Sequence, residues 1–114
     1  MLIFHKLKVK GLKKETAKAV SIVFDIPSNL VNDFRFIAGQ YVTIQKAFSG
    51  NIIRRAYSIC SIPGEKELRI VIKAVKNGVF STFATTVLKE GDFLEVAKPE
   101  GKFVLETISD KTKN

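Results

Sequence analysis

The sequence Arg54-Arg55-Ala56-Tyr57-Ser58-Ile59-Cys60-Ser61 is typical of a β-strand in which an arginine and an aromatic ring stand two residues apart. Successive side chains of a strand alternate between faces, so Arg55 and Tyr57 share one face, about 6–7 Å apart. A guanidinium suits phosphate oxygens, and a flat ring suits stacking on a heterocycle. The pair therefore predicts a nucleotide-type cofactor, although taken alone it also fits a solvated or cross-strand pair.

Alternation of apolar and polar residues extends along most of the chain and predicts six strands. Turn-forming stretches such as Ser49-Gly50-Asn51 and Pro63-Gly64 separate them, and Pro27 ends a clearly half-buried strand. The predicted strands contain Leu7 and Val9, Val20 to Ile26, Gly39 to Ile44, Ile52 to Ile59, Leu68 to Ala74, and Phe93 to Lys98. Six short strands at near-regular spacing favour a small antiparallel barrel, with an open sandwich as the alternative.

One segment between the fifth and sixth strands has the period of a helix. Its apolar residues recur at i, i+3, i+4, i+7 and i+8, which is the stripe of a short amphipathic helix. These residues are Phe80, Phe83, Ala84, Val87 and Leu88. Gly91 follows as a helix exit, and a weaker helical turn is expected at Ser28 to Asp33.

The start of this helix is a candidate anion site. The stretch Lys76-Asn77-Gly78-Val79-Phe80-Ser81-Thr82 leads from a strand through a glycine turn into the helix. Unpaired N–H groups and the positive end of the helix dipole favour an anion at such a place. Gly78 lets the backbone come close, and Ser81 or Thr82 adds a hydroxyl donor. Alternatively, Ser81 only caps the helix.

Composition limits the chemistry that this single domain of 114 residues can perform. The formal net charge of +8 favours an anionic partner, although scattered lysines also keep sheet surfaces unpaired. Cys60 is the only cysteine, so a disulfide, a zinc site and an iron–sulfur cluster are excluded and no metal is expected. His5 is the only histidine; it leaves almost no material for a Ser-His-Asp site and is expected on a solvated strand edge. No apolar run is long enough to span a bilayer, so we expect a soluble, cytoplasmic protein without a membrane partner.

Three motifs occur in a defined order: Arg55-Ala56-Tyr57-Ser58, Gly78-Val79-Phe80-Ser81 and Pro99-Glu100-Gly101-Lys102-Phe103. Together they resemble the FAD-binding domain of the ferredoxin–NADP reductase family, over nearly the whole chain from Phe4 to Phe103. The stretch from Arg54 to Ser61 is most similar to reductase components of the phenylacetyl-CoA oxygenase type. The resemblance implies an all-β fold, a six-stranded antiparallel Greek-key β-barrel with one short capping helix. It also implies that FAD is the cofactor of an oxidoreductase.

The resemblance assigns roles to individual residues. Arg55 would bind the FAD pyrophosphate, and Tyr57 would stack on the isoalloxazine or contact its ribityl chain. Ser58 would lie near the reactive flavin nitrogen, which makes it the candidate catalytic residue. Backbone groups from Val71 to Lys73 would line the flavin, and the helix start would hold the pyrophosphate. The other implied cofactor residues are Ala56, Val71, Ile72, Lys73, Gly78, Val79, Phe80, Ser81 and Thr82.

The resemblance also sets the expected domain organisation, a barrel over residues 1–106 and a polar tail over residues 107–114. Family members continue into a nicotinamide-binding domain, and the oxygenase reductases add a ferredoxin-type domain. Neither is expected in this chain, which has one cysteine and no Gly-rich dinucleotide motif. We therefore expect an FAD-binding module that passes electrons between a nicotinamide cofactor and a ferredoxin-like acceptor supplied separately, so turnover by this chain alone stays open.

Two other functions remain open from the sequence. A basic β-barrel with eleven aromatic residues could bind single-stranded nucleic acid through a cationic surface and stacking rings. The chain could also be a cofactor-free fragment that only docks to a partner protein. The addition of FAD to the purified protein discriminates between these hypotheses, because only a flavin-binding module acquires a protein-bound flavin spectrum.

Overall fold

The computed structural model describes residues 2–37, 39–61 and 67–101. Its elements are β1 (Phe4–Thr16), β2 (Ala19–Asp25), the 3-10 helix η1 (Ser28–Leu30), β3 (Tyr41–Phe48), β4 (Asn51–Ser58), β5 (Leu68–Lys73), α1 (Val79–Thr86) and β6 (Phe93–Ala97). The expected Pro63-Gly64 turn, the end of the third motif at Lys102-Phe103 and the tail over 107–114 lie outside the described residues.

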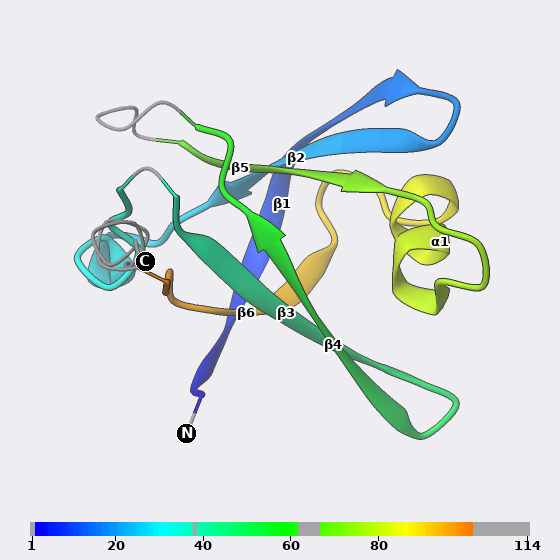
Figure 1. Cartoon of the computed structure of the whole chain (residues 1–114). Helices are drawn as coiled ribbons and strands as arrows, with labels where there is room; N and C mark the ends of the chain where they lie inside the picture. Colours follow the sequence, from blue (N-terminus) through cyan, green and yellow to red (C-terminus); the bar gives the residue numbers. More distant parts are fainter. Residues whose placement is uncertain (1, 38, 62–66, 102–114) are drawn as a thin grey trace, which may run out of the picture.

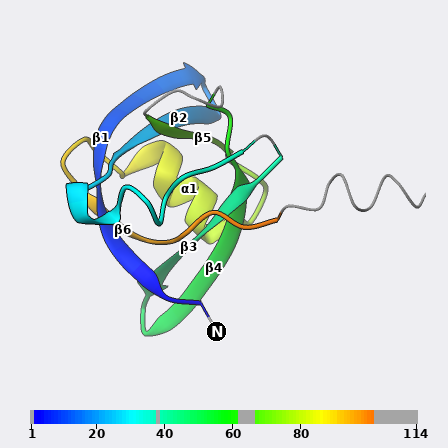
Figure 2. The same cartoon turned by 90° about the vertical axis from the view of Figure 1, so that its left-hand side faces the viewer.

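The six strands form one antiparallel sheet in the order β4-β3-β6-β1-β2-β5, which curls into a half-barrel (Figures 1 and 2). The two end strands meet where Ile59 forms a bridge with Ile70 and the N–H of Cys60 donates to the carbonyl of Arg69 at 2.9 Å. Away from this contact β4 and β5 diverge, and α1 lies between them (Figure 1). The predicted six-stranded barrel with one helix is confirmed, and the sandwich alternative is wrong.

The core fills the inner face of this curled sheet, as the alternation predicts. Its fully buried side chains include Leu7, Val9, Val20, Ile22, Phe24, Val42, Ile44, Leu68, Ile70, Ile72, Phe80 and Val96. Each such large apolar side chain contributes roughly 1.5–3 kcal/mol when it leaves water. Phe80, Ala84 and Leu88 add the buried side of α1 and of the residues after it. The helix therefore closes the core on the side that the strands leave open.

Strand β2 differs from the half-buried strand that its pattern predicts, because both of its faces are buried. Ala19, Ser21 and Val23, which lie on the face opposite the core, are at most 9% exposed. Part of the cover comes from β1, where the Glu15 carboxylate accepts a hydrogen bond of 2.7 Å from the Ser21 hydroxyl. Alternation with small and apolar residues such as Ala19 and Val23 is equally compatible with burial on both faces.

Two further predictions need correction. Helix α1 ends at Thr86, so Val87 is not part of the apolar stripe and is 55% exposed, whereas Leu88 is buried as predicted. His5 is half-buried rather than solvated: it pairs with Val96 of β6, and its ring lies 5.8 Å from that of Phe34. Among the described residues, no helix has the length and apolar character needed to cross a membrane.

Candidate functional site

Strand β4 carries Arg55 and Tyr57 on the inner face of the sheet. Arg55 lies directly opposite Ile44 of β3, and Tyr57 lies opposite Val42. Directly opposed residues of an antiparallel pair share a face, and both β3 residues belong to the buried core. The predicted register is therefore confirmed.

Arg55 is exposed because β4 is an end strand of the sheet. Its Nη1 donates to the backbone carbonyl of Arg54 at 2.7 Å, and no described carboxylate pairs with its guanidinium. Tyr57 is half-buried; burial raises the pKa of its hydroxyl above the usual 10.0, and the positive charge of Arg55 offsets part of that rise. The site thus combines a neutral phenol ring with a nearby cation that has donors to spare.

Four rings from β3, β4 and α1 form an aromatic cluster: Phe48, Tyr57, Phe80 and Phe83. The ring centroids of Tyr57 and Phe80 are 5.9 Å apart, and those of Phe48 and Phe83 are 5.5 Å apart. Such separations are typical of favourable aromatic pairs. Because Phe80 lies in the first turn of α1, the cluster brings the predicted stacking ring beside the predicted anion site.

Gly78 shapes the turn that leads into α1. A Cβ atom at this position would collide with the Val75 Cγ2 atom and the Ser81 Oγ atom. The φ angle of Gly78 is −84°, so the glycine is needed for space, whereas Asn77 before it takes the left-handed conformation at φ 64°. The space that Gly78 leaves is thus needed by the chain's own atoms, and its close approach to an anion stays a prediction.

Ser81 is buried, and its hydroxyl acts within this turn. It accepts a hydrogen bond from the Val75 N–H at 3.1 Å and donates to the Gly78 carbonyl at 3.3 Å. The hydroxyl therefore holds the turn before α1 together and does not face the site as a spare donor. Thr82 is exposed, but its N–H already donates to the Gly78 carbonyl at 2.9 Å.

The backbone N–H groups of the first turn of α1 are the donors that remain. The N–H groups of Val79, Phe80 and Ser81 precede the first acceptor that an α-helix supplies, and no side chain caps this end. The first turn contains no acidic residue either. An anion can therefore take these donors without displacing a carboxylate.

Strand β5 contributes its free edge. Arg69 turns away from β2, since its N–H donates to the Ser61 hydroxyl at 2.7 Å and its carbonyl accepts from Cys60. Backbone direction alternates along an antiparallel strand, so Val71 and Lys73 turn their N–H and C=O groups to the same edge. Ile72, the third residue of the predicted set, is fully buried and pairs with Val20 of β2, so its N–H and C=O groups turn to β2 and away from this edge.

Two predicted residues, Ala56 and Ser58, lie on the other face of β4. Ala56 is opposite Thr43 and Ser58 is opposite Tyr41, and both are exposed. Ser58 ends the strand just before the contact between Ile59 and β5. The structure therefore separates Ser58 from the face of Tyr57 but keeps it next to the point where the two end strands meet.

Lys46 is a residue of this region that the sequence reasoning missed. It follows Val42 and Ile44 on the inner face of β3, and its Nζ lies 4.9 Å from the centroid of Phe83 and 5.8 Å from that of Phe48. The signal was present in the sequence, because a lysine interrupts the inward-facing series of Val42, Ile44 and Phe48.

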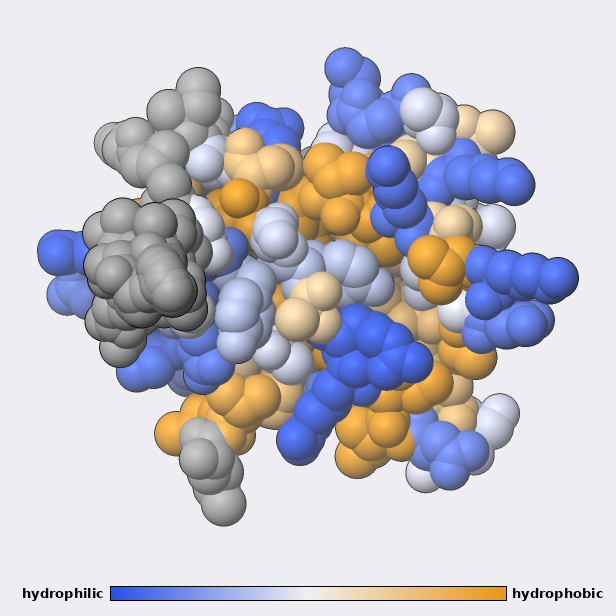
Figure 3. Space-filling view, viewed as in Figure 1, coloured by the Kyte–Doolittle hydropathy of each residue, from blue (hydrophilic) through white to orange (hydrophobic). Residues whose placement is uncertain are grey.

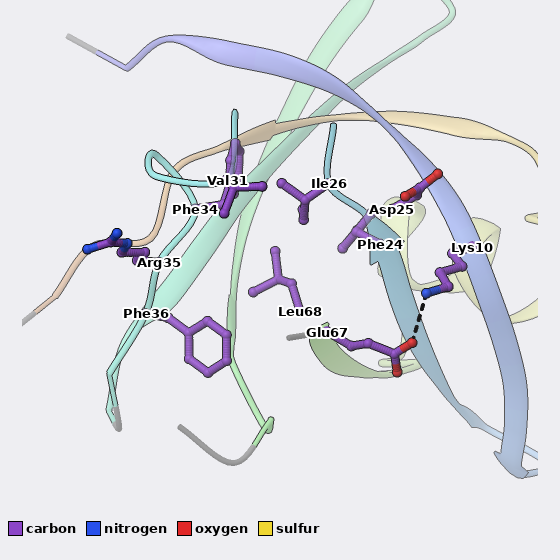
Figure 4. A pocket seen from close by; sticks show the side chains of 10 residues that line it. All are labelled: Lys10, Phe24, Asp25, Ile26, Val31, Phe34, Arg35, Phe36, Glu67 and Leu68. Atoms are coloured by element: carbon purple, nitrogen blue, oxygen red, sulfur yellow. Dashed lines mark hydrogen bonds and ion pairs between the residues drawn. The ribbon is translucent and has the colours of Figure 1, made fainter. Parts of the chain in front are cut away.

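A cavity of about 590 Å³ lies away from these residues (Figure 4). Apolar side chains that include Phe34 and Phe36 line one side, and the Lys10–Glu67 ion pair of 2.9 Å lies on the other. None of the predicted site residues lines it. The candidate site is instead the open side of the half-barrel, which comprises the free edges of β4 and β5 with the start of α1. Figure 3 shows apolar and hydrophilic side chains interleaved over this side of the molecule.

The sequence matches the family described as "Oxidoreductase FAD-binding domain" over residues 6–105. The chain belongs to this family. As an FAD-binding domain it has the cofactor class that the sequence predicted, and the family confirms the predicted resemblance.

Individual relatives agree with this assignment. The chain is 40% identical over 105 residues to a component of the 1,2-phenylacetyl-CoA epoxidase of Escherichia coli K12, and the match covers 90% of this chain and 29% of the epoxidase component. The structure of phthalate dioxygenase reductase, described as modular for electron transfer from pyridine nucleotides to [2Fe-2S], superimposes with a TM-score of 0.71 at 27% identity, over 88% of this chain and 30% of that one.

A third comparison supports the fold. A ferredoxin NADP+ reductase from Neisseria gonorrhoeae with bound FAD and NADP gives a TM-score of 0.75 at 23% identity, over 90% of this chain and 40% of that one. The present FAD-binding domain thus spans less than a third of the epoxidase component and of the phthalate dioxygenase reductase.

The residues of the open side fit FAD. A diphosphate needs several donors at once, and Arg55 and the first N–H groups of α1 are donors of that kind. A flavin ring needs a flat apolar partner, and the half-buried ring of Tyr57 has that character.

Proposed function

We propose that this chain holds FAD on the open side of the half-barrel and carries electrons between NAD(P)H and an iron–sulfur or ferredoxin-type partner. The observation that carries the proposal is the packing of the Tyr57 ring against the Phe80 ring, whose centroids are 5.9 Å apart. It joins the strand with Arg55 to the start of α1, so one extended ligand can meet a ring, a guanidinium and a helix start.

In this proposal Arg55 and the first turn of α1 bind the diphosphate, and Tyr57 stacks on the flavin. The edge of β5 at Val71 and Lys73 lines the ring system. Gly78 and Ser81 act indirectly, because they set the turn from which the N–H groups of α1 are presented. Ser58 is the residue at the strand end nearest the reacting edge of the flavin.

FAD, when bound, supplies the redox chemistry, and the protein supplies orientation and electrostatics. The positive charge of Arg55 and of the start of α1 holds the anionic part of the cofactor, while the inner face keeps water from one side of Tyr57. Because the family match covers the FAD-binding domain alone, the nicotinamide site and the electron acceptor belong to other domains or proteins in this proposal. The same proposal includes a cytoplasmic location.

Titration of the purified chain with FAD tests the proposal. We expect quenching of flavin fluorescence and a shifted visible spectrum that persists after gel filtration. A parallel titration with a labelled single-stranded oligonucleotide serves as the comparison. Oligonucleotide binding without flavin binding would favour the nucleic-acid hypothesis, and binding of neither would favour a cofactor-free docking fragment.

A further inference from the structure

Lys46 occupies an inward-facing position that the strand pattern reserves for apolar side chains. It lies opposite Ile53 of β4, two pairs beyond the pair of Ile44 with Arg55. On one face of an antiparallel ladder such diagonal neighbours lie within reach of each other's long side chains, at about 7–8 Å. Lys46 and Arg55 are therefore two cations on the same face.

The positive charge of Lys46 has no counter-ion among the described residues. Its Nζ lies over the ring of Phe83 and near that of Phe48, at 4.9 Å and 5.8 Å from their centroids. The side chain is half-buried, and no described carboxylate forms an ion pair with it. Two rings attract an ammonium group but do not neutralise it. A half-buried cation without a counter-ion favours the approach of an anion.

The rings that hold Lys46 belong to the aromatic cluster at the start of α1. Phe83 is 6.1 Å from Phe80, whose ring contacts Tyr57. The first turn of α1 adds partial positive charge and contains no acidic residue. Arg55 on β4, Lys46 on β3 and the start of α1 thus place positive charge on three elements that the aromatic cluster joins.

We propose that Lys46 is a second cation of the cofactor site and strengthens binding of the FAD diphosphate. The inference rests on the proposed function. The alternative role is a structural clamp, in which Lys46 only joins β3 to α1 through its contacts with Phe48 and Phe83. The two roles differ in their dependence on phosphate, because a clamp would support every flavin equally.

The chain offers a matched control for this test. Lys8 lies over the ring of Phe93 at 6.0 Å, directly opposite it on the outer face of the sheet. Lys8→Met and Lys46→Met remove the same charge and the same kind of ring contact while they keep an unbranched apolar stem. Only Lys46 shares a face with Arg55.

The experiment measures dissociation constants of FAD and of riboflavin, which has no phosphate, at low and high salt for the parent chain and three variants. Lys46→Met should weaken FAD about ten- to a hundred-fold at low salt, the range expected for one lost charge-assisted contact. It should leave riboflavin within about two-fold, and the FAD effect should shrink at high salt. Lys46→Arg should stay within about three-fold of the parent because the charge and the ring contact persist. Lys8→Met should match the parent for both ligands.

Three outcomes would overturn the inference. In the first, Lys46→Met binds FAD as tightly as Lys8→Met does. In the second, it weakens FAD and riboflavin by the same factor or lowers the melting temperature far more than Lys8→Met, which identifies a clamp. If the destabilised variant precludes titration, Lys46→Gln repeats the comparison with a polar stem. The third outcome, a parent chain that binds no FAD, overturns the proposed function itself and is distinguished by the parent titration.

Discussion

The two faces of β4 carry neighbouring arginines that differ in their hydrogen bonds: Arg54 donates to a side chain across the sheet, and Arg55 donates to a backbone carbonyl. Arg54, on the outer face, donates from Nε to the Gln45 side chain at 2.9 Å and lies 5.1 Å from the centroid of the Phe4 ring. Gln45 in turn donates to Glu95 at 2.7 Å, so Arg54 belongs to a network across the sheet. Arg55, on the inner face, bonds only to a backbone carbonyl of its own strand among the described contacts. The two arginines carry equal charge and are adjacent in sequence, but the guanidinium of Arg54 is bonded within the sheet and that of Arg55 is available to a ligand.

The largest expected effect tests this comparison directly. Arg55→Ala should weaken FAD roughly ten-fold to several hundred-fold, because charge-assisted hydrogen bonds contribute about 1.5–3 kcal/mol each and about 1.4 kcal/mol corresponds to ten-fold. Arg54→Ala should act only through diffuse charge, by a few-fold that high salt removes. FAD dissociation constants of both variants at two salt concentrations provide the measurement.

The control for this pair is the fold of each variant. Removal of Arg54 breaks the bond to Gln45, so its cost should appear in the melting temperature rather than in FAD binding. If Arg54→Ala were the worse variant for FAD, the functional assignment of the two faces would be reversed.

A second substitution tests whether the inner face depends on the shape of the helix start. Gly78→Ala places a Cβ against Val75 and Ser81, which should cost roughly 1–3 kcal/mol of unfolding free energy as overpacking does. The displaced turn should also lower FAD affinity about ten-fold by moving the N–H groups of α1. Thermal melts and FAD titrations measure the two effects.

Gly11→Ala is the matched control for Gly78→Ala. A Cβ at Gly11 would meet only the Val23 Cβ, at 3.8 Å, which is ordinary contact. Gly11 lies at a register shift of the β1–β2 ladder, but its φ is not positive and the added Cβ makes only ordinary contact, so we expect this variant to stay within about 1 kcal/mol of the parent, with unchanged FAD binding. Equal behaviour of the two alanine variants would show that the turn does not shape the site.

A smaller effect concerns the length of the ligand that the inner face accepts. Arg55 and the start of α1 together offer donors for two phosphates, so FAD should bind more tightly than FMN, by about three- to ten-fold if one weak charge-assisted contact is gained. Fluorescence titration of both flavins against the same preparation measures the ratio. Equal or tighter binding of FMN would place only one phosphate between β4 and α1.

Strand positions and the shared face of Arg55 and Tyr57 followed from the sequence, because side chains two residues apart on a strand lie on one face. The end of α1 did not, since an apolar residue such as Val87 fits the helical period whether or not it is covered. The buried role of Ser81 could not be predicted either, because a serine in the first turn fits a cap, a ligand contact and a turn contact equally well. Lys46 was missed because its ring partners lie on β3 and α1, and only the fold brings these elements together.

The smallest expected effect is at Cys60, just beyond the strand that carries both arginines. Its N–H donates to the Arg69 carbonyl at 2.9 Å, and its Sγ lies 3.4 Å from the same oxygen, where β4 meets β5. A serine hydroxyl can donate to that carbonyl as well as a thiol can. Cys60→Ser should therefore keep FAD affinity within about two- to three-fold, less than one lost neutral hydrogen bond would cause. FAD titration and a thermal melt of the variant provide the check. Complete loss of flavin from a folded Cys60→Ser variant would mean that the sulfur itself contributes to the site. The contrast between the faces of Arg54 and Arg55 would then not be enough to describe the site at the end of β4.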